Sequence, residues 1–406
     1  MDRGANLEFN KNIEVIIIDL LCLTPFYDKY LFQGLKKRIQ NLKLITISFH
    51  KDISYFKRND IRISGPLINI VARIQINKKV IRQLLKTFEY ILNLFLITNI
   101  FILKPPDIIY IQWVPFITKL PFEVWFLNLM KFCGIKIVYT VHNVLPHDTG
   151  NKYMKCFSRV YKIADLLICH TEHAKQRLVS EFKIDANSVE IIPHGPMFHD
   201  SIKINHEDAR LRLGFNGEVI VLFFGLLRQY KGIDFLLQAW KEVLEQCSKA
   251  FLLIVGDGDR TYKQRMIDKI IDLGISETVK LELRFVSNDE LVIYHQAADI
   301  LVYPYKEISQ SGALLTGMTF GKPIVATTVG GIKEILVNNE TAVLVDYGDV
   351  NGFSKALVDL IKDPHKRGEL GGKALDLVHS KYSWDMVARK TIKSFYKLMN
   401  KGKTRK

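Results

Sequence analysis

The sequence predicts an α/β protein built from two doubly wound, Rossmann-like domains. Its 406 residues fit two domains of about 200 residues each. With 48% hydrophobic and 24% charged residues, the chain can bury ordinary cores and is not a disordered polymer. Short β-branched runs alternate with segments of helical periodicity along its whole length, which is typical of parallel sheets covered by helices on both faces. We expect domains over residues 1–200 and 201–383.

The first domain shows six short apolar runs that read as strands, separated by helical periodicity such as that of residues 29–40 and 152–164. The predicted strands are 13–19, 42–49, 107–113, 135–141, 165–170 and 189–193. Residues 201–218 are polar and contain turn residues, so we expect them to form a linker.

The alternation restarts after the linker. The predicted strands are 219–225, 250–258, 279–285, 298–304, 322–328 and 342–346, and the predicted helices are 232–246, 260–273, 288–297, 312–320 and 331–337. A last helix, 384–400, is expected to pack back on the first domain. Two such domains facing each other would form a cleft, with ligands at the carboxyl ends of the strands.

Positive charge is concentrated in the first half and in the tail. The net charge is +15, and residues 29–90 hold 14 basic side chains against three acidic ones, a local excess of +11. Such patches attract anionic lipid head groups, phosphorylated acceptors or nucleic acid; a generic basic surface is the plainer interpretation. Nucleic acid is not expected as a partner, because no zinc finger, RNP-like aromatic motif or basic repeat accompanies the charge.

The sequence favours a cytoplasmic protein. Five scattered cysteines contain no C-x-x-C pair, and the N-terminal residues lack a signal-peptide pattern. The apolar run 88–103 contains Glu89 and is shorter than the roughly 20 residues of a membrane span. It therefore predicts a buried or membrane-touching helix, and we expect peripheral association with the inner face of the membrane.

Two turns after strands of the second domain carry residues suited to an anion. Arg228 and Lys231 lie three residues apart just before a helix, where free amides and the helix dipole also favour negative charge. Gly256 and Gly258 follow the next strand and allow close backbone approach. Each feature alone has a plain alternative, namely solvated surface charges and an ordinary tight turn.

A third loop strengthens this interpretation. Ser309, Ser311 and Gly312 precede an apolar helix, and a serine N-cap followed by glycine leaves amides available for a phosphate. Glycines 330 and 331 repeat the arrangement one strand later, with Glu334 on the following helix. Ordinary helix capping would explain any one loop, whereas several such strand ends together suggest a nucleotide diphosphate at the sheet edge.

In the first domain, His142 ends a predicted strand where a cleft-lining residue would lie, and His147 follows it. No carboxylate or cysteine framework accompanies the histidines, so no metal site is expected. A packed or capping His142 is the alternative. No G-x-S-x-G motif supports a serine nucleophile.

The order of these motifs resembles that of the GT-B glycosyltransferases, specifically glycosyltransferase family 4, the group 1 transferases. The matching stretches are TVHN (140–143), ADLLICHTEHAKQRL (164–178), IIPHG (191–195), FFGLLRQYKGID (223–234), LLIVGDGD (252–259), ADILVYP (298–304), SGALLTGMTFGKPIVATTVGGIKEIL (311–336) and YSWDMVARK (382–390).

The resemblance implies transfer of a sugar from a nucleotide-diphosphate-sugar of UDP or GDP type to a glycan or polyprenyl-linked acceptor. The reaction usually retains anomeric configuration and needs no metal and no cofactor. By the same resemblance, Arg228 and Lys231 hold the donor pyrophosphate, Gly225, Gly256 and Gly258 lie near the donor, and His142 is the first-domain histidine. The acceptor side would include Tyr27, Asp28, Asn143 and His147.

One departure from the family pattern concerns a pair of glutamates spaced E-x7-E. Alignment on residues 321–323 places Ile308 and Thr316 at those positions, and Glu307 misses by one residue. Ser309, Ser311 and backbone amides are therefore expected to take over donor contacts. The resemblance implies a role in cell-surface polysaccharide or glycolipid synthesis. A non-catalytic sugar-nucleotide-binding protein, a GT-B epimerase and an inverting mechanism remain alternatives.

Overall fold

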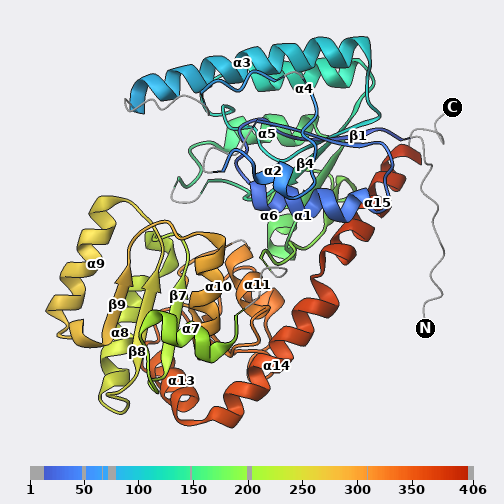
Figure 1. The fold of residues 1–406 in the computed structure, drawn as a ribbon. Coiled ribbons are helices and arrows are strands. Elements are labelled where there is room, and N and C mark those ends of the chain that lie inside the picture. The colour runs from blue at the N-terminus through green and yellow to red at the C-terminus, as the bar shows by residue number, and fades with distance from the viewer. Residues whose placement is uncertain are drawn as a thin grey trace, which may run out of the picture. The chain divides into compact units, whose positions relative to one another are not determined.

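The computed structural model describes residues 13–47, 52–65, 67–71, 79–146, 149–198, 204–308 and 310–400. The chain divides into two compact units (Figure 1). The first unit combines Met1–Pro193 with Trp384–Lys406, and the second is His194–Ser383. Each has its own hydrophobic core.

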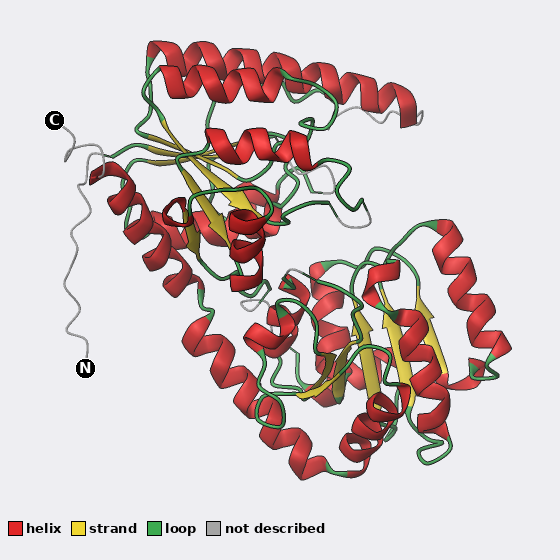
Figure 2. Ribbon diagram, turned by 180° about the vertical axis from the view of Figure 1, so that it is seen from behind, coloured by secondary structure: helices red, strands yellow, loops and turns green. Residues whose placement is uncertain are grey.

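Within the described residues, the first unit holds a six-stranded parallel sheet in the order β2-β1-β3-β4-β5-β6. Its strands are β1 (Val15–Asp19), β2 (Leu42–Thr46), β3 (Ile108–Ile111), β4 (Lys136–Val141), β5 (Leu166–Cys169) and β6 (Val189–Ile191). Its helices are α1 (Pro25–Lys36), α2 (Tyr55–Arg58), α3 (Lys79–Leu103), α4 (Phe122–Phe132), α5 (Met154–Ile163), α6 (Glu172–Ser180) and α15 (Trp384–Asn400), with the 3-10 turn η1 (Ala186–Ser188). Figure 2 shows the strands lying between helical layers.

The second unit repeats this architecture in the strand order β12-β11-β10-β7-β8-β9. Its strands are β7 (Ile220–Phe224), β8 (Phe251–Val255), β9 (Val279–Glu282), β10 (Ile300–Tyr303), β11 (Ile324–Thr327) and β12 (Val343–Val345). Its helices are α7 (His206–Leu213), α8 (Ile233–Leu244), α9 (Arg260–Asp272), α10 (Asn288–Ala297), α11 (Gly312–Met318), α12 (Ile332–Ile335), α13 (Val350–Lys362) and α14 (Pro364–Lys381), with the 3-10 turns η2 (Gln229–Lys231) and η3 (Ser276–Thr278).

The strand order fixes where each sheet can bind a ligand. In the first unit β1 pairs with both β2 and β3, and in the second β7 pairs with both β8 and β10. After β1 the chain first adds β2 on one side and then β3 on the other, and after β7 it first adds β8 on one side and later β10 on the other. Strands β1 and β7 therefore each mark a topological switch point. Crevices outside the carboxyl ends of strands at a switch point are the usual ligand sites of doubly wound sheets. The predicted α/β fold class with doubly wound sheets is confirmed.

The C-terminal helix α15 belongs to the first unit and lies along α1 (Figure 1). A Cβ added to Gly34 would lie 3.1 Å from the Trp384 carbonyl oxygen, so the two helices approach closely where α1 has no side chain. The Trp384 ring stacks on Tyr30, and Arg38 forms an ion pair with Asp385 at 2.6 Å. Helix α15 therefore completes the cover of one sheet face.

Two predicted segments are corrected by the structure. Residues 29–40 were predicted as a helix, but α1 begins at Pro25 and ends at Lys36. Proline is favoured in the first helical turn because its missing N–H has no partner there in any case. Tyr27 and Asp28 therefore lie within a helix. The predicted strand 250–258 ends at Val255, because Gly256 with φ 155° leaves the extended conformation.

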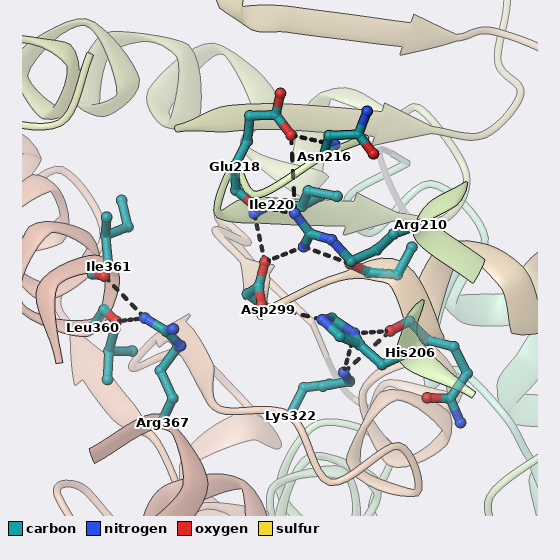
Figure 3. Close-up of polar contacts among 12 residues, drawn as sticks. His206, Arg210, Asn216, Glu218, Ile220, Asp299, Lys322, Leu360, Ile361 and Arg367 are labelled. Carbon is teal, nitrogen blue, oxygen red and sulfur yellow. Dashed lines mark hydrogen bonds and ion pairs between the residues drawn. The ribbon is translucent and has the colours of Figure 1, made fainter. Parts of the chain in front are cut away.

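The predicted linker 201–218 contains helix α7, begun by Asn205, whose side chain accepts from the Asp208 amide, and ended by Gly214 in the left-handed conformation. Arg210 of α7 is buried and forms an ion pair with Asp299 at 2.9 Å (Figure 3). The sequence did not predict this helix because the segment is polar. An ion pair, not an apolar stripe, attaches α7 to the rest of the unit.

Candidate active site

The turns at the carboxyl edge of the second sheet are in backbone contact. A Cβ on Gly256, after β8, would lie 1.8 Å from the Gly225 carbonyl oxygen after β7. A Cβ on Gly258 would lie 2.5 Å from the Leu227 carbonyl oxygen. Both positions therefore require glycine, and the two predicted glycine turns form one layer of backbone at the sheet edge.

Lys231 ends the η2 turn after β7 and is buried. Its ammonium nitrogen lies 3.7 Å from the centroid of the Tyr305 ring and 5.3 Å from that of Tyr230. Burial lowers the pKa of Lys231 to about 8. In the described part of the chain no carboxylate forms an ion pair with this ammonium group. The site therefore holds a desolvated cation beside aromatic faces.

Gly232 brings the β7 and β10 turns together directly behind Lys231. It has φ 67°, and a Cβ there would lie 1.8 Å from the Pro304 carbonyl oxygen. Because Tyr305 follows Pro304, this contact sets the ring against the lysine. Helix α8 begins at the next residue, so its N-terminal dipole adds positive potential close to the ammonium group.

Ser311, Gly312 and His194 continue this site. The Ser311 side chain caps α11 by accepting from the Leu314 amide at 3.1 Å, and its oxygen lies 3.5 Å from the Tyr305 hydroxyl. A Cβ on Gly312 would lie 3.2 Å from His194 Cε1. His194 is buried, and burial lowers its pKa to about 4, so its ring is neutral at pH 7.

The structure thus brings several predicted donor residues into one connected group, which we call the switch-point cluster. Its members, each next to the following one, are Lys231, Tyr305, Ser311, Gly312 and His194.

The other predicted donor residues lie around or apart from this cluster. Arg228 is half exposed, 4.0 Å from Asp259 across the β8 turn. Thr316 is buried, and its hydroxyl accepts from the Met197 amide at 3.1 Å. Glu334 is exposed on α12, where its charge adds to burial in raising the pKa of Tyr382. Ser309 lies outside the described residues.

In the first unit, His142 follows β4 and is enclosed by aromatic rings. The Trp113 ring, which follows β3, stacks on it at 5.0 Å with an interplanar angle of 11°. Tyr27 meets the imidazole edge-on at 4.9 Å, and His170, after β5, lies at 5.5 Å. His142 is only 7% exposed. Residues from three adjacent strand ends thus converge beside the switch point of this sheet.

Asp28 takes a different place from the one predicted. It is fully buried on α1 beside Asp19, the last residue of β1, and burial followed by the Asp19 charge raises its pKa well above the usual range. The Asp19 carboxylate accepts from the Thr24 amide at 2.9 Å. Asp28 therefore contacts no solvent in this structure. Asn143 is half buried, and His147 lies outside the described residues.

Four residues of these sites were not among the predicted site residues: Tyr305, His194, Trp113 and His170. Tyr305 and Trp113 each lie two residues beyond the end of a buried strand, His170 directly follows β5, and His194 lies in the IIPHG stretch after β6. A search of every strand end for aromatic and histidine side chains, as well as for charges and glycines, would have found them.

Among the described residues, no three His, Cys, Asp or Glu side chains gather in a group that could hold a metal ion. The arrangement of the second unit is suited to a phosphate-bearing ligand, because a buried ammonium, glycine turns and a helix N-terminus lie at one sheet edge.

Comparison with protein families agrees with this chemistry. Residues 218–363 match the family described as glycosyl transferases group 1, and residues 33–195 match glycosyltransferase family 4.

Similar sequences include the D-inositol 3-phosphate glycosyltransferase of Corynebacterium diphtheriae, 29% identical over 279 residues that cover 64% of this chain and 65% of that protein. An uncharacterized glycosyltransferase of Methanocaldococcus jannaschii is 27% identical over 67% of this chain and 71% of its own length. The chain thus spans slightly less than two thirds of the Corynebacterium relative.

Among solved structures, Anabaena HepE in complex with UDP superposes with a TM-score of 0.74 at 15% identity, covering 95% of this chain and 100% of that one. A glycosyltransferase from Rickettsia africae superposes with a TM-score of 0.71 at 18% identity, covering 96% and 99%. These structural likenesses show the fold, and together with the family matches they define the class, the glycosyltransferases with the GT-B fold. Within this class, the chain belongs to the family 4-like glycosyltransferases, the group 1 transferases.

Proposed function

We propose that this glycosyltransferase takes its sugar from a UDP-linked donor whose diphosphate binds at Lys231. The observation that carries the proposal is the buried ammonium of Lys231, which lies at the switch point of the second sheet and has no ion-pair partner in the described part of the chain. An isolated buried cation is costly unless an anion joins it. The Anabaena neighbour was solved with UDP and with UDP-glucose, which favours uridine over guanosine in the donor.

The switch-point cluster would act mainly on the leaving group. During transfer, the bond from the sugar C1 to the diphosphate oxygen breaks, and a bond from C1 to an acceptor oxygen forms. The diphosphate leaves with the electron pair, and its departing oxygen takes the proton that the acceptor hydroxyl loses. The Lys231 ammonium would neutralise this developing charge in a desolvated site, where such contacts are strong. We propose that the reaction needs no metal ion and retains anomeric configuration.

Other donor contacts would come from the surrounding turns. Arg228, half exposed at the rim and only 4.0 Å from Asp259, can swing from that weak ion pair to a phosphate oxygen. The glycine layer of Gly225, Gly256 and Gly258 would admit the nucleoside close to the backbone. Ser311 and Gly312, beside Tyr305, would hold the second phosphate or the sugar.

The acceptor would bind at the carboxyl edge of the first sheet. Trp113, His142 and Tyr27 form an aromatic group there, and aromatic faces suit the apolar faces of a sugar. We propose a glycan or polyprenyl-linked acceptor in cell-surface polysaccharide or glycolipid synthesis, at the cytoplasmic face of an anionic membrane. His142 is proposed to hydrogen-bond the transferred sugar or orient the acceptor.

The donor can be tested by thermal denaturation of the full chain with UDP-, GDP- and ADP-sugars. A ligand that binds only the folded state raises the melting temperature. We expect UDP-sugars to raise it in the wild type and to have little effect on Lys231→Met. Equal shifts in both proteins would contradict the assignment of Lys231.

Turnover can be tested by release of nucleotide from a labelled donor with and without a lipid extract. Release that depends on the extract supports transfer. Binding without release would indicate a sugar-nucleotide-binding protein, and conversion of the donor without any extract would indicate an epimerase.

A further inference from the structure

Helices α3 and α4 leave a broad apolar face at the surface of the first unit. They lie side by side over one face of its sheet in both ribbon views (Figures 1 and 2). The α3 face is formed by side chains that are between 41% and 68% exposed: Val80, Ile81, Leu84, Leu85, Phe88 and Phe95. Because α3 has 25 residues, it is about 37 Å long.

The neighbouring helix extends this face. Trp125, Leu129 and Phe132 recur at the spacing that places them on one side of α4, and Phe132 is 88% exposed. Ile102 and Leu103 add exposed apolar surface at the end of α3. Contiguous apolar patches on this scale mark interaction sites, and the side chains of a folded soluble domain rarely form them without a partner.

The charges around this face have one sign. The acids of these two helices, Glu89 and Glu123, are both buried. Glu89 accepts from the amides of Ile70 and Val71, and Glu123 accepts from the Tyr90 hydroxyl. Among the described side chains of α3 and α4, every exposed charge is therefore basic.

Exposed cations border the apolar face at both of its ends. They are Arg82 near the start of α3, Lys104 just after its end and Lys119 before α4. Lys131 on α4 is also exposed, but it forms an ion pair with Asp165 at 3.5 Å. An apolar face with aromatic side chains, bordered by cations and without exposed carboxylates on either of its helices, is complementary to anionic lipid head groups over a hydrocarbon layer.

We infer that this α3–α4 face docks into one leaflet of an anionic lipid bilayer. The inference extends the proposed function, since a lipid-linked acceptor would lie in the same membrane, but its evidence is separate from the donor site. By length and composition alone, α3 could cross a membrane, and it is the helix of the described residues that meets this test. Its inner face argues that it lies in the interface instead.

That inner face belongs to the folded domain. Tyr90, Leu94, Ile97 and Phe101 are buried in the core of the first unit. Asn93 is also buried and exchanges two hydrogen bonds with the backbone of Ile68, which fixes the 67–71 segment to the helix. A spanning α3 would lose these contacts and carry Glu89 into hydrocarbon. A helix buried on one face and apolar on the other can instead rest along the membrane plane.

The test is flotation of the full chain with vesicles of phosphatidylglycerol and phosphatidylcholine in equal parts, at low and high salt. Leu84→Ser, Phe88→Ser and Phe95→Ser combined should weaken vesicle binding on the order of 100-fold or more. Arg82→Gln with Lys104→Gln should weaken it about 25-fold, since each basic group contributes about 5-fold near an anionic surface. High salt should weaken wild-type binding in the same direction.

Control variants show whether a loss of vesicle binding is specific to the α3–α4 face. Leu211, Ile271 and Val337 are exposed apolar residues of the second unit, and their combined serine variant should bind vesicles like the wild type. UDP-sugar thermal shifts, measured without vesicles, should be unchanged in all variants, so failure of the donor proposal can be recognised separately. Wild type that does not float, or a triple variant that floats equally well, would overturn the inference. So would a dimer in solution that the triple variant abolishes, since a second copy would then cover this face.

Discussion

Replacing Lys231 by methionine should make the protein more stable and far less active. Methionine keeps the length and apolar stem of the side chain but removes the ammonium group. The ammonium is buried, and its pKa is about 8 in the folded chain against an ordinary value of 10.5. At pH 7 this difference corresponds to a cost of about 3 kcal/mol. Attraction to the Tyr305 ring offsets about 0.5–2 kcal/mol, so the variant should gain about 1–3 kcal/mol.

The sign of the pH dependence follows from the same pKa. Below pH 8 both the folded and the unfolded chain hold the Lys231 proton, and the folded chain bears the full cost of a buried charge. Between about pH 8 and 10.5 the folded chain releases the proton first, so wild-type stability should rise relative to the variant and the difference should close.

Lys231→Met should lower activity although it raises stability. Removing one buried charge that stabilises a leaving diphosphate costs about 2–4 kcal/mol of barrier, or roughly 30- to 1,000-fold in rate. Donor affinity of the wild type should also fall as pH rises above about 8, because the neutral amine no longer attracts phosphate.

The assays are thermal denaturation at pH 7 and pH 10 and nucleotide release at saturating donor. Lys306→Met is the matched control, since Lys306 is an exposed lysine after the neighbouring strand β10, and it should change neither quantity appreciably. A Lys231→Met protein that is less stable yet retains full turnover would refute the reasoning, because Lys231 would then be a structural residue.

Three further predictions concern stability. Asp28→Asn should raise stability at pH 7 and flatten the pH dependence of stability in chemical denaturation. Because burial raises the pKa of Asp28, the wild-type carboxyl favours folding less as pH rises above its unfolded pKa. An unchanged pH profile would contradict this. Arg210→Ala should cost about 3 kcal/mol, measured in the same way, because it removes the buried guanidinium that pairs with the Asp299 carboxylate at 2.9 Å (Figure 3). A loss below about 1 kcal/mol would argue against this role. Gly256→Ala should lower the free energy of unfolding by more than about 2 kcal/mol, because the new Cβ has no room. Gly368→Ala, with open space on helix α14, should raise it by about 0.5–1 kcal/mol. Similar values for the two variants would show that the turn adapts.

The fold could be predicted because the strongest signals in the sequence are local. Apolar β-branched runs become parallel strands, and the helix predicted over 288–297 matches α10, which begins with a capping box formed by Ser287 and Glu290. Helix α7 was missed because the segment has no apolar stripe, although Asn205 and Gly214 mark its two ends. The burial of Arg210 depends on a partner 89 residues away.

The candidate sites show the same division. Lys231 and the glycines were selected from turn position, and the structure places them at one sheet edge. Tyr305 could not be selected, because its relation to Lys231 depends on strand order. Strand β10 lies beside β7, although its first residue, Ile300, comes 76 positions after Phe224, the last residue of β7. Asp28 was predicted on the acceptor side from the family resemblance, whereas α1 buries it beside Asp19.

The placement of α15 has a practical consequence for dissecting the enzyme. The second unit is one uninterrupted stretch, His194–Ser383, so we expect it to fold when it is expressed by itself. A fragment that stops at Pro193 would instead lack α15, leaving Tyr30 without Trp384 and Tyr110 without Phe395. Such a truncated fragment is expected to aggregate, and grafting residues 384–400 through a short spacer, or supplying them as a synthetic peptide, should rescue it.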